Sequence, residues 1–171
     1  GTERIYEVAK KIKRGKLFVD IQGDQPLIDP KAIDLTVEFH KKNKHFEIVL
    51  PSMPIDTEVN NKNLVKCIFS DNGRLIYFSR VKAPFNYKNT KVSYYKNLSI
   101  ISFTPNALKK FYYSKMGSVE KIEGIELLRA LENNISIGTL IIKGSDFAVD
   151  VNADLMKAID IMPRDKIRKL Y

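Results

Sequence analysis

The chain has 171 residues, 44% of them hydrophobic and 29% charged, which suits one globular domain able to bury a sizeable core. No apolar run approaches the roughly 18 residues of a membrane-spanning helix, and the printed sequence shows no signal-peptide pattern, so we expect a cytoplasmic protein without a membrane partner. The net charge of +9 is scattered over short lysine-rich runs, which favours a solvated surface or a phosphate-rich small substrate over a nucleic-acid partner. The single Cys67 excludes an internal disulfide and is expected to be a buried structural thiol.

The first part of the chain alternates between helical and extended patterns. The hydrophobic spacing predicts, in order, a helix, a strand buried on both faces, a second helix and a second strand: residues 2–13, 17–21, 31–42 and 47–51. The inward faces of the two helices are expected to be Ile5, Val8, Ala9 and Ile12, followed by Ile33, Val37 and Phe39. Asp29 before Pro30 is typical of a capped helix start. This order predicts an α/β fold with a mainly parallel, Rossmann-like sheet flanked by helices.

The middle of the chain has a different pattern. Residues 64–70 and 74–79 alternate with period two on either side of the turn sequence DNG, which predicts a β-hairpin. Residues 96–103 are expected to form another strand. One domain over residues 1–171, with an antiparallel insertion over about residues 52–95, accounts for this order.

The last third returns to helices and one more strand. Thr104 before Pro105 predicts a helix that ends near Tyr113. The remaining elements are expected to be a continuous helix from Ser118, an edge-like strand and a final helix capped by Asn152: residues 118–133, 135–142 and 152–161.

The residues best suited to chemistry follow the first strand, in the sequence VDIQGDQPLIDP over residues 19–30. A glycine turn presents Gln22 and Asp24 at the end of a strand, where open α/β sheets bind ligands. Asp150 follows another apolar run and directly precedes the start of a helix. Mg²⁺ commonly takes one or two carboxylates together with substrate phosphates, so Asp24 and Asp150 form a candidate metal pair. A turn-forming role for Asp24 and a helix-start role for Asp150 explain the same residues on local grounds.

Six segments match one family in order along nearly the whole chain. They are GTER at 1–4, VDIQGDQPLI at 19–28, NLVKCIF at 63–69, LIYFSR at 75–80, IEGIELLRALE ending at 132, and VDVNADL at 149–155. With them the chain resembles the 3-deoxy-manno-octulosonate cytidylyltransferases (CMP-Kdo synthetases), within the wider group of sugar-acid cytidylyltransferases. Each segment by itself is weak, but the ordered set is specific.

The resemblance implies a nucleotidyltransferase reaction. The anomeric hydroxyl of a 3-deoxy-2-keto sugar acid, Kdo or a related acid, would attack the α-phosphate of CTP, and pyrophosphate would leave; the CMP-sugar would serve cell-surface polysaccharide synthesis. It further implies the fold of nucleotide-diphospho-sugar transferases, a Mg²⁺ cofactor and a homodimer with the hairpin and the loop at 81–93 near the contact.

The resemblance also implies roles for individual residues. The catalytic magnesium ligands would be Asp24 and Asp150. The nucleotide contacts would be Gly1, Thr2, Arg4 and Gln22. In the sugar site, Arg80 would pair with the carboxylate, because its planar fork meets a carboxylate with two bonds, and Glu126 would accept hydrogen bonds from hydroxyls.

The chain departs from the family pattern in two places. The glycine-rich, basic nucleotide-binding loop that precedes GTER in the family is not among the 171 residues, so we expect an N-terminally incomplete domain without measurable CTP turnover. In the sugar pocket the family's RHLGIYGY is KNLSIISF here, with Asn97 at the histidine and Ile101 at the first tyrosine, and Leu127 replaces a glutamine. Because lost polar contacts change substrate preference strongly, we expect a relative of Kdo, such as a deoxygenated or amino-substituted acid.

Other interpretations predict different partners. A zinc site at His40 and His45 would lack cysteine ligands. Neighbouring tyrosines and lysines fit a nucleic-acid-binding surface in composition only, and buried or interface roles suit the tyrosines better. A non-catalytic or regulatory relative, which keeps the fold and the dimer interface without turnover, would also lack the nucleotide loop and is the alternative.

Overall fold

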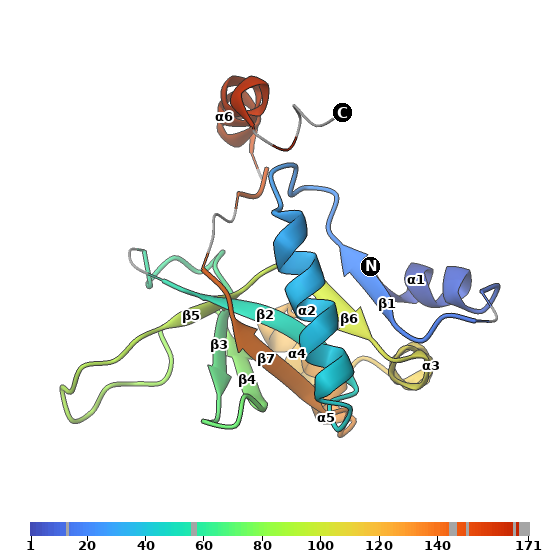
Figure 1. Cartoon of the computed structure of the whole chain (residues 1–171). Helices are drawn as coiled ribbons and strands as arrows, with labels where there is room; N and C mark the ends of the chain where they lie inside the picture. Colours follow the sequence, from blue (N-terminus) through green and yellow to red (C-terminus); the bar gives the residue numbers. More distant parts are fainter. Residues whose placement is uncertain (13, 56–57, 144–146, 150, 166, 168–171) are drawn as a thin grey trace.

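One sheet forms the centre of the protein, with helices on both of its faces (Figure 1). The computed structural model describes residues 1–12, 14–55, 58–143, 147–149, 151–165 and 167. The helices are α1 Thr2–Ala9, α2 Pro30–Lys42, α3 Pro105–Tyr113, α4 Ser118–Glu123, α5 Leu128–Glu132, α6 Asn152–Ile161 and the 3₁₀ helix η1 Met162–Arg164. The strands are β1 Phe18–Ile21, β2 Ile48–Pro54, β3 Lys66–Phe69, β4 Leu75–Ser79, β5 Tyr95–Asn97, β6 Ile100–Phe103 and β7 Ile137–Ile141. In this described part of the chain, no helix is both long and apolar enough to cross a bilayer.

Two hydrophobic clusters lie on opposite faces of the sheet. Successive side chains of a strand point to opposite faces, and β6 contributes Ile100 to one cluster and both Ile101 and Phe103 to the other. The smaller cluster includes Ala32 of α2, whereas the larger one includes Phe111 of α3 and residues of α1 and α5. The α/β prediction is therefore confirmed as a layered arrangement of helices around one sheet.

The strand directions differ from the prediction. The strand order is β1-β6-β2-β5-β3-β4, with β7 beside β2. Within the described residues only β2 and β7 pair in parallel, and every other ladder is antiparallel. The prediction of a mainly parallel sheet is wrong. Strands β1 and β2 do run in the same direction, but β6 lies between them and is antiparallel to both, which the order of elements along the chain could not reveal.

Strand β1 is also less buried than expected. Its first three residues are partly buried and Ile21 is exposed, and among the described residues β1 pairs with β6 alone. It is an edge strand of this sheet rather than a strand covered on both faces.

The predicted hairpin is confirmed. Strands β3 and β4 pair antiparallel, with Cys67 opposite Phe78. The thiol of Cys67 is buried, and burial raises its pKa to about 12, as expected of a structural cysteine. The hairpin turn also reaches β7, where the Thr139 N–H donates to the Gly73 carbonyl at 2.8 Å, so the edge of β7 is partly covered.

Two elements that were expected to be continuous are each divided. The segment at 96–103 contributes to two strands, β5 and β6, which both pair with β2 and are separated where the Leu98 N–H bonds to the Pro51 carbonyl. The helix expected from Ser118 ends at Gly124, whose φ of +62° is left-handed, and α5 begins only at Leu128. Glu126 therefore lies in the turn between two short helices.

The two helix starts that were predicted from capping residues, at Asp29 and Thr104, are confirmed. The Asp29 carboxylate accepts the Lys31 N–H at 2.9 Å, and the Thr104 hydroxyl accepts the Ala107 N–H at 3.1 Å. The last helix does begin at Asn152, but the cap position is Val151, whose N–H donates to Asp154.

The predicted inward faces of the first two helices are only partly right. In α1, Val8 is 58% exposed and Tyr6 takes the buried place. In α2 the fully buried positions are Ala32, Thr36 and His40, and the predicted Ile33, Val37 and Phe39 are partly buried. The buried face is shifted because His40 has hydrogen-bond partners in the core, which spacing alone does not show.

Candidate functional site

The turn after β1 is anchored on both sides. The Gln22 N–H donates to the Ser99 carbonyl at 3.3 Å, and the Gln25 side chain donates to the Ser99 hydroxyl at 2.9 Å. The Val149 N–H donates to the Asp24 carbonyl at 2.9 Å. The polypeptide of the last third therefore meets the β1 turn directly at Asp24, whose side chain is exposed.

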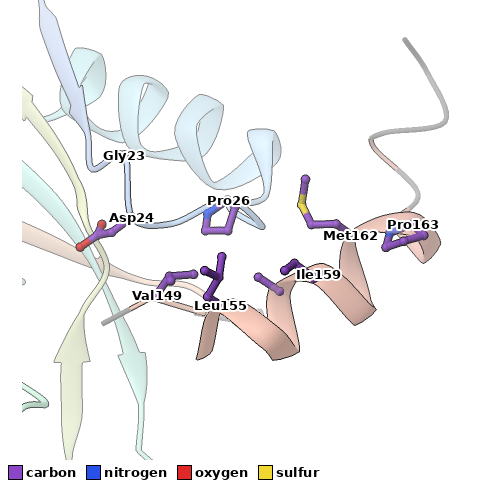
Figure 2. A pocket seen from close by; sticks show the side chains of 9 residues that line it. Gly23, Asp24, Pro26, Val149, Leu155, Ile159, Met162 and Pro163 are labelled. Atoms are coloured by element: carbon purple, nitrogen blue, oxygen red, sulfur yellow. The ribbon is translucent and has the colours of Figure 1, made fainter. Parts of the chain in front are cut away.

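A cavity of about 650 Å³ separates this turn from α6 (Figure 2). Apolar side chains line its far wall: Leu155, Ala158, Ile159, Met162 and Pro163. Figure 2 shows the Asp24 side chain at the opposite end, pointing away from the helix. The apolar wall and the carboxylate thus lie on different sides of the same turn.

Asp150 lies outside the described residues, so the predicted pairing of its carboxylate with that of Asp24 stays a prediction. Among the described residues, no three or more His, Cys, Asp and Glu side chains gather as a metal site. A magnesium ion that is bound by substrate phosphates needs only one or two protein carboxylates, fewer than the three side chains of such a group. An exposed carboxylate on a turn whose backbone is held by Val149 fits one half of such a set.

A second group of polar residues gathers between β1, the start of α1 and the α4–α5 turn. The Thr2 hydroxyl, buried at the start of α1, donates to the Glu126 carboxylate at 3.0 Å. The Gln22 amide donates to the Asp20 carboxylate at 3.1 Å. Burial and the nearby charge of Glu126 raise the pKa of Asp20, whereas its hydrogen bond from Gln22 lowers it. Three predicted site residues therefore lie together, joined by Asp20.

Two of the predicted nucleotide residues lie close to this group. A Cβ atom added to Gly1 would lie 3.3 Å from a Glu126 carboxylate oxygen, so Gly1 sits against the same side chain. Arg4 is exposed on the first turn of α1, where its N–H donates to the Gly1 carbonyl at 3.1 Å.

Asp20 is the site residue that the sequence analysis missed. It lies in β1 two positions before Gln22, which directly follows the strand, and the hydrogen bond from the Gln22 amide brings the two side chains together. The spacing of two residues along an extended segment is the signal in the sequence that points to Asp20.

Arg80 follows β4 and is held mainly by backbone carbonyls. Its guanidinium donates to the carbonyls of Glu123 at 2.7 Å, Lys62 at 3.0 Å and Gly124 at 3.1 Å, and its own N–H donates to the Glu123 carboxylate at 3.1 Å. These contacts attach it to the segment that leads to Glu126. Three of the five guanidinium N–H groups are used, which leaves two for a ligand.

The residues that depart from the family pattern have different environments. Ile101, opposite Asp20 in the β1–β6 ladder, and Leu127 are both buried in the larger hydrophobic cluster. Asn97 is partly buried in β5, where its N–H bonds to the Val65 carbonyl at 3.3 Å. Two of the three changes therefore add apolar packing next to the polar group rather than new hydrogen bonds.

Both ring nitrogens of His40 are occupied by protein partners. His40 is buried in α2, and its ring nitrogens lie 2.8 Å from the Ser102 hydroxyl and 3.1 Å from the Phe46 carbonyl. A carbonyl can only accept, so Nε2 carries the proton and Nδ1 accepts from Ser102. His40 is therefore a neutral, fully paired core residue.

Comparison with known proteins points to the same family as the sequence motifs. A family profile described as Cytidylyltransferase matches residues 1–137. The 3-deoxy-manno-octulosonate cytidylyltransferase of Rickettsia canadensis is 37% identical over 163 residues, which are 93% of this chain and 65% of the relative. The protein of the same name from Fusobacterium nucleatum is 34% identical, with 98% of this chain and 69% of the relative covered. The chain thus spans about two thirds of the length of these curated relatives.

Solved structures support the fold. A structure described as CMP:2-keto-3-deoxy-manno-octonic acid synthetase complexed with CTP matches with a TM-score of 0.89 at 24% identity, over 95% of this chain and 68% of that one. A putative glucose-1-phosphate thymidylyltransferase from Bacillus anthracis matches with a TM-score of 0.61 at 16% identity, over 94% of this chain and 60% of that one. The structural matches show the fold, and the family profile and the curated relatives show that the chain belongs to the cytidylyltransferase family and is related to its 3-deoxy-manno-octulosonate members.

Proposed function

We propose that this chain forms the sugar-acid and metal part of a cytidylyltransferase that transfers CMP from CTP to a 3-deoxy-2-keto sugar acid. The anomeric oxygen forms a bond to the α-phosphorus, the bond from that phosphorus to the bridging oxygen breaks, and pyrophosphate leaves while the hydroxyl proton passes to solvent. Such chemistry depends on positioning and charge neutralisation. The hydrogen bond from the Val149 N–H to the Asp24 carbonyl carries the proposal, because it joins the two segments that hold the proposed acids.

Asp24 and Asp150 would hold a Mg²⁺ ion, which, when bound, neutralises charge on the phosphates. The exposed Asp24 side chain, at the end of β1, is available for that role. The protein's own part is to hold this carboxylate still, through the backbone bonds of the turn to Ser99 and Val149.

The sugar acid would lie between Arg80 and Glu126. The two remaining N–H groups of the Arg80 guanidinium can meet a carboxylate, and Glu126 can accept from sugar hydroxyls. Gln22 and Thr2 would then face the nucleotide side, beside Gly1 and Arg4. The apolar Ile101 and Leu127 support the expectation of a substrate with fewer hydroxyls than Kdo, or with an amino group in place of one.

The test measures CMP-sugar formation by the full-length protein that contains this chain, with CTP, Mg²⁺ and 3-deoxy-2-keto sugar acids. We expect D24N to lower kcat by about 100-fold or more, because it removes a charge that acts in the transition state. D29N is the matched control, because asparagine also caps a helix and the α2 start should be kept. Equal activities of D24N and D29N would contradict the assignment of Asp24.

The same assay identifies the preferred sugar acid and distinguishes a catalytic protein from a non-catalytic relative. We expect a deoxygenated or amino-substituted relative to have a higher kcat/KM than Kdo, and a preference for Kdo over every relative tested would contradict that. A folded full-length protein that forms no CMP-sugar with any of these acids would instead support the non-catalytic relative.

We also propose that the protein is a homodimer, with the loop at 81–93 near the contact. Phe85 and Tyr87 in this loop are 83% and 84% exposed, and a dimer contact would cover the apolar surface that these two neighbouring aromatic side chains present. Sedimentation velocity at micromolar concentration checks this, and a mass of one chain would contradict it.

A further inference from the structure

Lys66, in β3, is a fully buried lysine. Its side chain is 0% exposed, and its ammonium group donates to the backbone carbonyls of Asn61 and of Arg80, the latter at 2.9 Å. Burying an ammonium group is costly unless its hydrogen bonds are satisfied. Burial, and secondly the charge of Arg80, lower the pKa of Lys66.

The two carbonyls that Lys66 binds belong to separate segments. One is in the connection between β2 and β3, and the other directly follows β4. Lys66 therefore ties the Asn61 segment to the backbone of Arg80. The Lys62 carbonyl, one residue further along that segment, accepts from the Arg80 guanidinium at 3.0 Å.

The Arg80 side chain is consequently held from two directions. The turn after α4 supplies the carbonyls of Glu123 and Gly124, and the segment held by Lys66 supplies the carbonyl of Lys62. An arginine with a flexible side chain loses entropy when it binds a carboxylate, and fixing it beforehand reduces that loss. Removing the Lys66 ammonium would release the Lys62 carbonyl and let the guanidinium move.

We propose that Lys66 is a positioning residue for Arg80: it fixes the segment at Asn61 and Lys62 so that the guanidinium presents its two remaining N–H groups to the carboxylate of the sugar acid. This inference rests on the proposed function of Arg80. It assigns to Lys66 no contact with either substrate. An apolar side chain at this position of β3 could also be buried, but it could not donate hydrogen bonds to the two carbonyls, so this role requires a lysine or another cationic side chain.

The experiment compares K66M and K66R with the parent full-length protein. We expect K66M to raise KM for the sugar acid by about 10- to 100-fold, because small misplacements of a binding group have effects of this size, and to leave KM for CTP unchanged. K66R, which keeps the charge, should recover part of the loss. K109M is the matched control, because Lys109 is exposed on α3, and it should leave both constants unchanged.

A double-mutant cycle with R80K separates positioning from a purely structural role. If Lys66 acts through Arg80, the free-energy change that corresponds to the rise in KM for the sugar acid will be much smaller in the double variant than the sum of the changes in K66M and R80K. Fully additive effects, or an equal rise in both KM values, would overturn the proposal. If K66M does not fold, as judged by its thermal melt, the cycle is measured with K66R, for which the same two outcomes apply.

Failure of this inference is distinguishable from failure of the proposed function. An active parent protein whose KM for the sugar acid is unchanged in K66M overturns the role of Lys66 alone. A parent protein that forms no CMP-sugar overturns the proposed function and the role of Lys66 with it.

Discussion

Buried titratable side chains in this protein each have an identifiable partner or remain neutral. His40 hydrogen bonds through both ring nitrogens, and burial lowers its pKa below the ordinary value of 6.5. Cys67 stays a thiol, since burial raises its pKa to about 12. Lys66 meets two carbonyls. The protonation state that each residue adopts is the one its partners can satisfy.

The lowered pKa of His40 predicts a pH dependence of stability. The unfolded chain takes up a proton at His40 as the pH falls below about 6.5, whereas the folded chain does so only at lower pH, so the free energy of unfolding falls in that interval by up to about 1.4 kcal/mol per pH unit. Urea unfolding between pH 7.5 and 5 measures this slope.

Histidine variants identify the source of that slope. H40Q should remove His40's share of it, and H45Q should keep it, because His45 is exposed on the surface. An unchanged slope in H40Q would mean that another group titrates in this range.

At the scale of elements, Gly124 decides how the segment from Ser118 folds. It ends α4 at φ +62°, and its carbonyl accepts a hydrogen bond from Arg80. The hydrophobic spacing is compatible with one long helix, so the sequence pattern favoured that interpretation. The glycine allows the break, which places Glu126 in a turn against Thr2 instead of on a continuous helix surface.

Replacing this glycine tests its part in the break. G124A should destabilise the protein by about 1–2 kcal/mol, because an L-residue with a side chain pays that cost in the left-handed region. G23A is the matched control: a Cβ at Gly23 would meet no atom within 4 Å and Gly23 has no positive φ, so little change is expected. Chemical denaturation measures both, and equal stabilities of the two variants would contradict the argument.

At the scale of the whole molecule, one buried arginine joins the helices of the larger cluster. Arg129 of α5 makes two hydrogen bonds with Glu120 of α4, at 2.7 and 2.8 Å, and a third with Glu3 of α1 at 3.1 Å. Its guanidinium also lies 4.7 Å from the ring centroid of Phe111 in α3. Helix α1, at the start of the chain, is thereby joined to α3, α4 and α5 at a single side chain.

Removing one partner of this buried pair should be costly. E120Q is expected to lower the free energy of unfolding by about 3 kcal/mol, because it leaves the Arg129 charge without its buried carboxylate partner and with only the exposed Glu3. E3Q should cost less than about 1 kcal/mol, because Glu3 is 57% exposed. Urea unfolding measures both variants. An equal loss of unfolding free energy in E120Q and E3Q would show that burial of the carboxylate does not determine the cost of removing its charge.

Short-range chemistry could be predicted from the sequence alone. The helix starts at Asp29 and Thr104 depend on bonds between residues two or three positions apart, and the β3–β4 hairpin depends on alternation around one turn. The ordered motifs identified the family, and the matches confirm it. In the site, the motifs pointed to Thr2, Gln22 and Glu126, which the structure brings into one region.

Only the tertiary structure decided which distant segments meet. The sequence could not show that β6 lies between β1 and β2, that His40 is buried in place of its apolar neighbours, or that Asp20 joins the site. These outcomes depend on partners that are distant in the sequence, such as Ser102, which lies 62 positions from His40. The hydrogen bonds and packing of such partners offset the cost of burial in ways that local spacing does not record. Local bonds and patterning are thus encoded near each residue, whereas strand neighbours and buried polar groups are set by the assembled core.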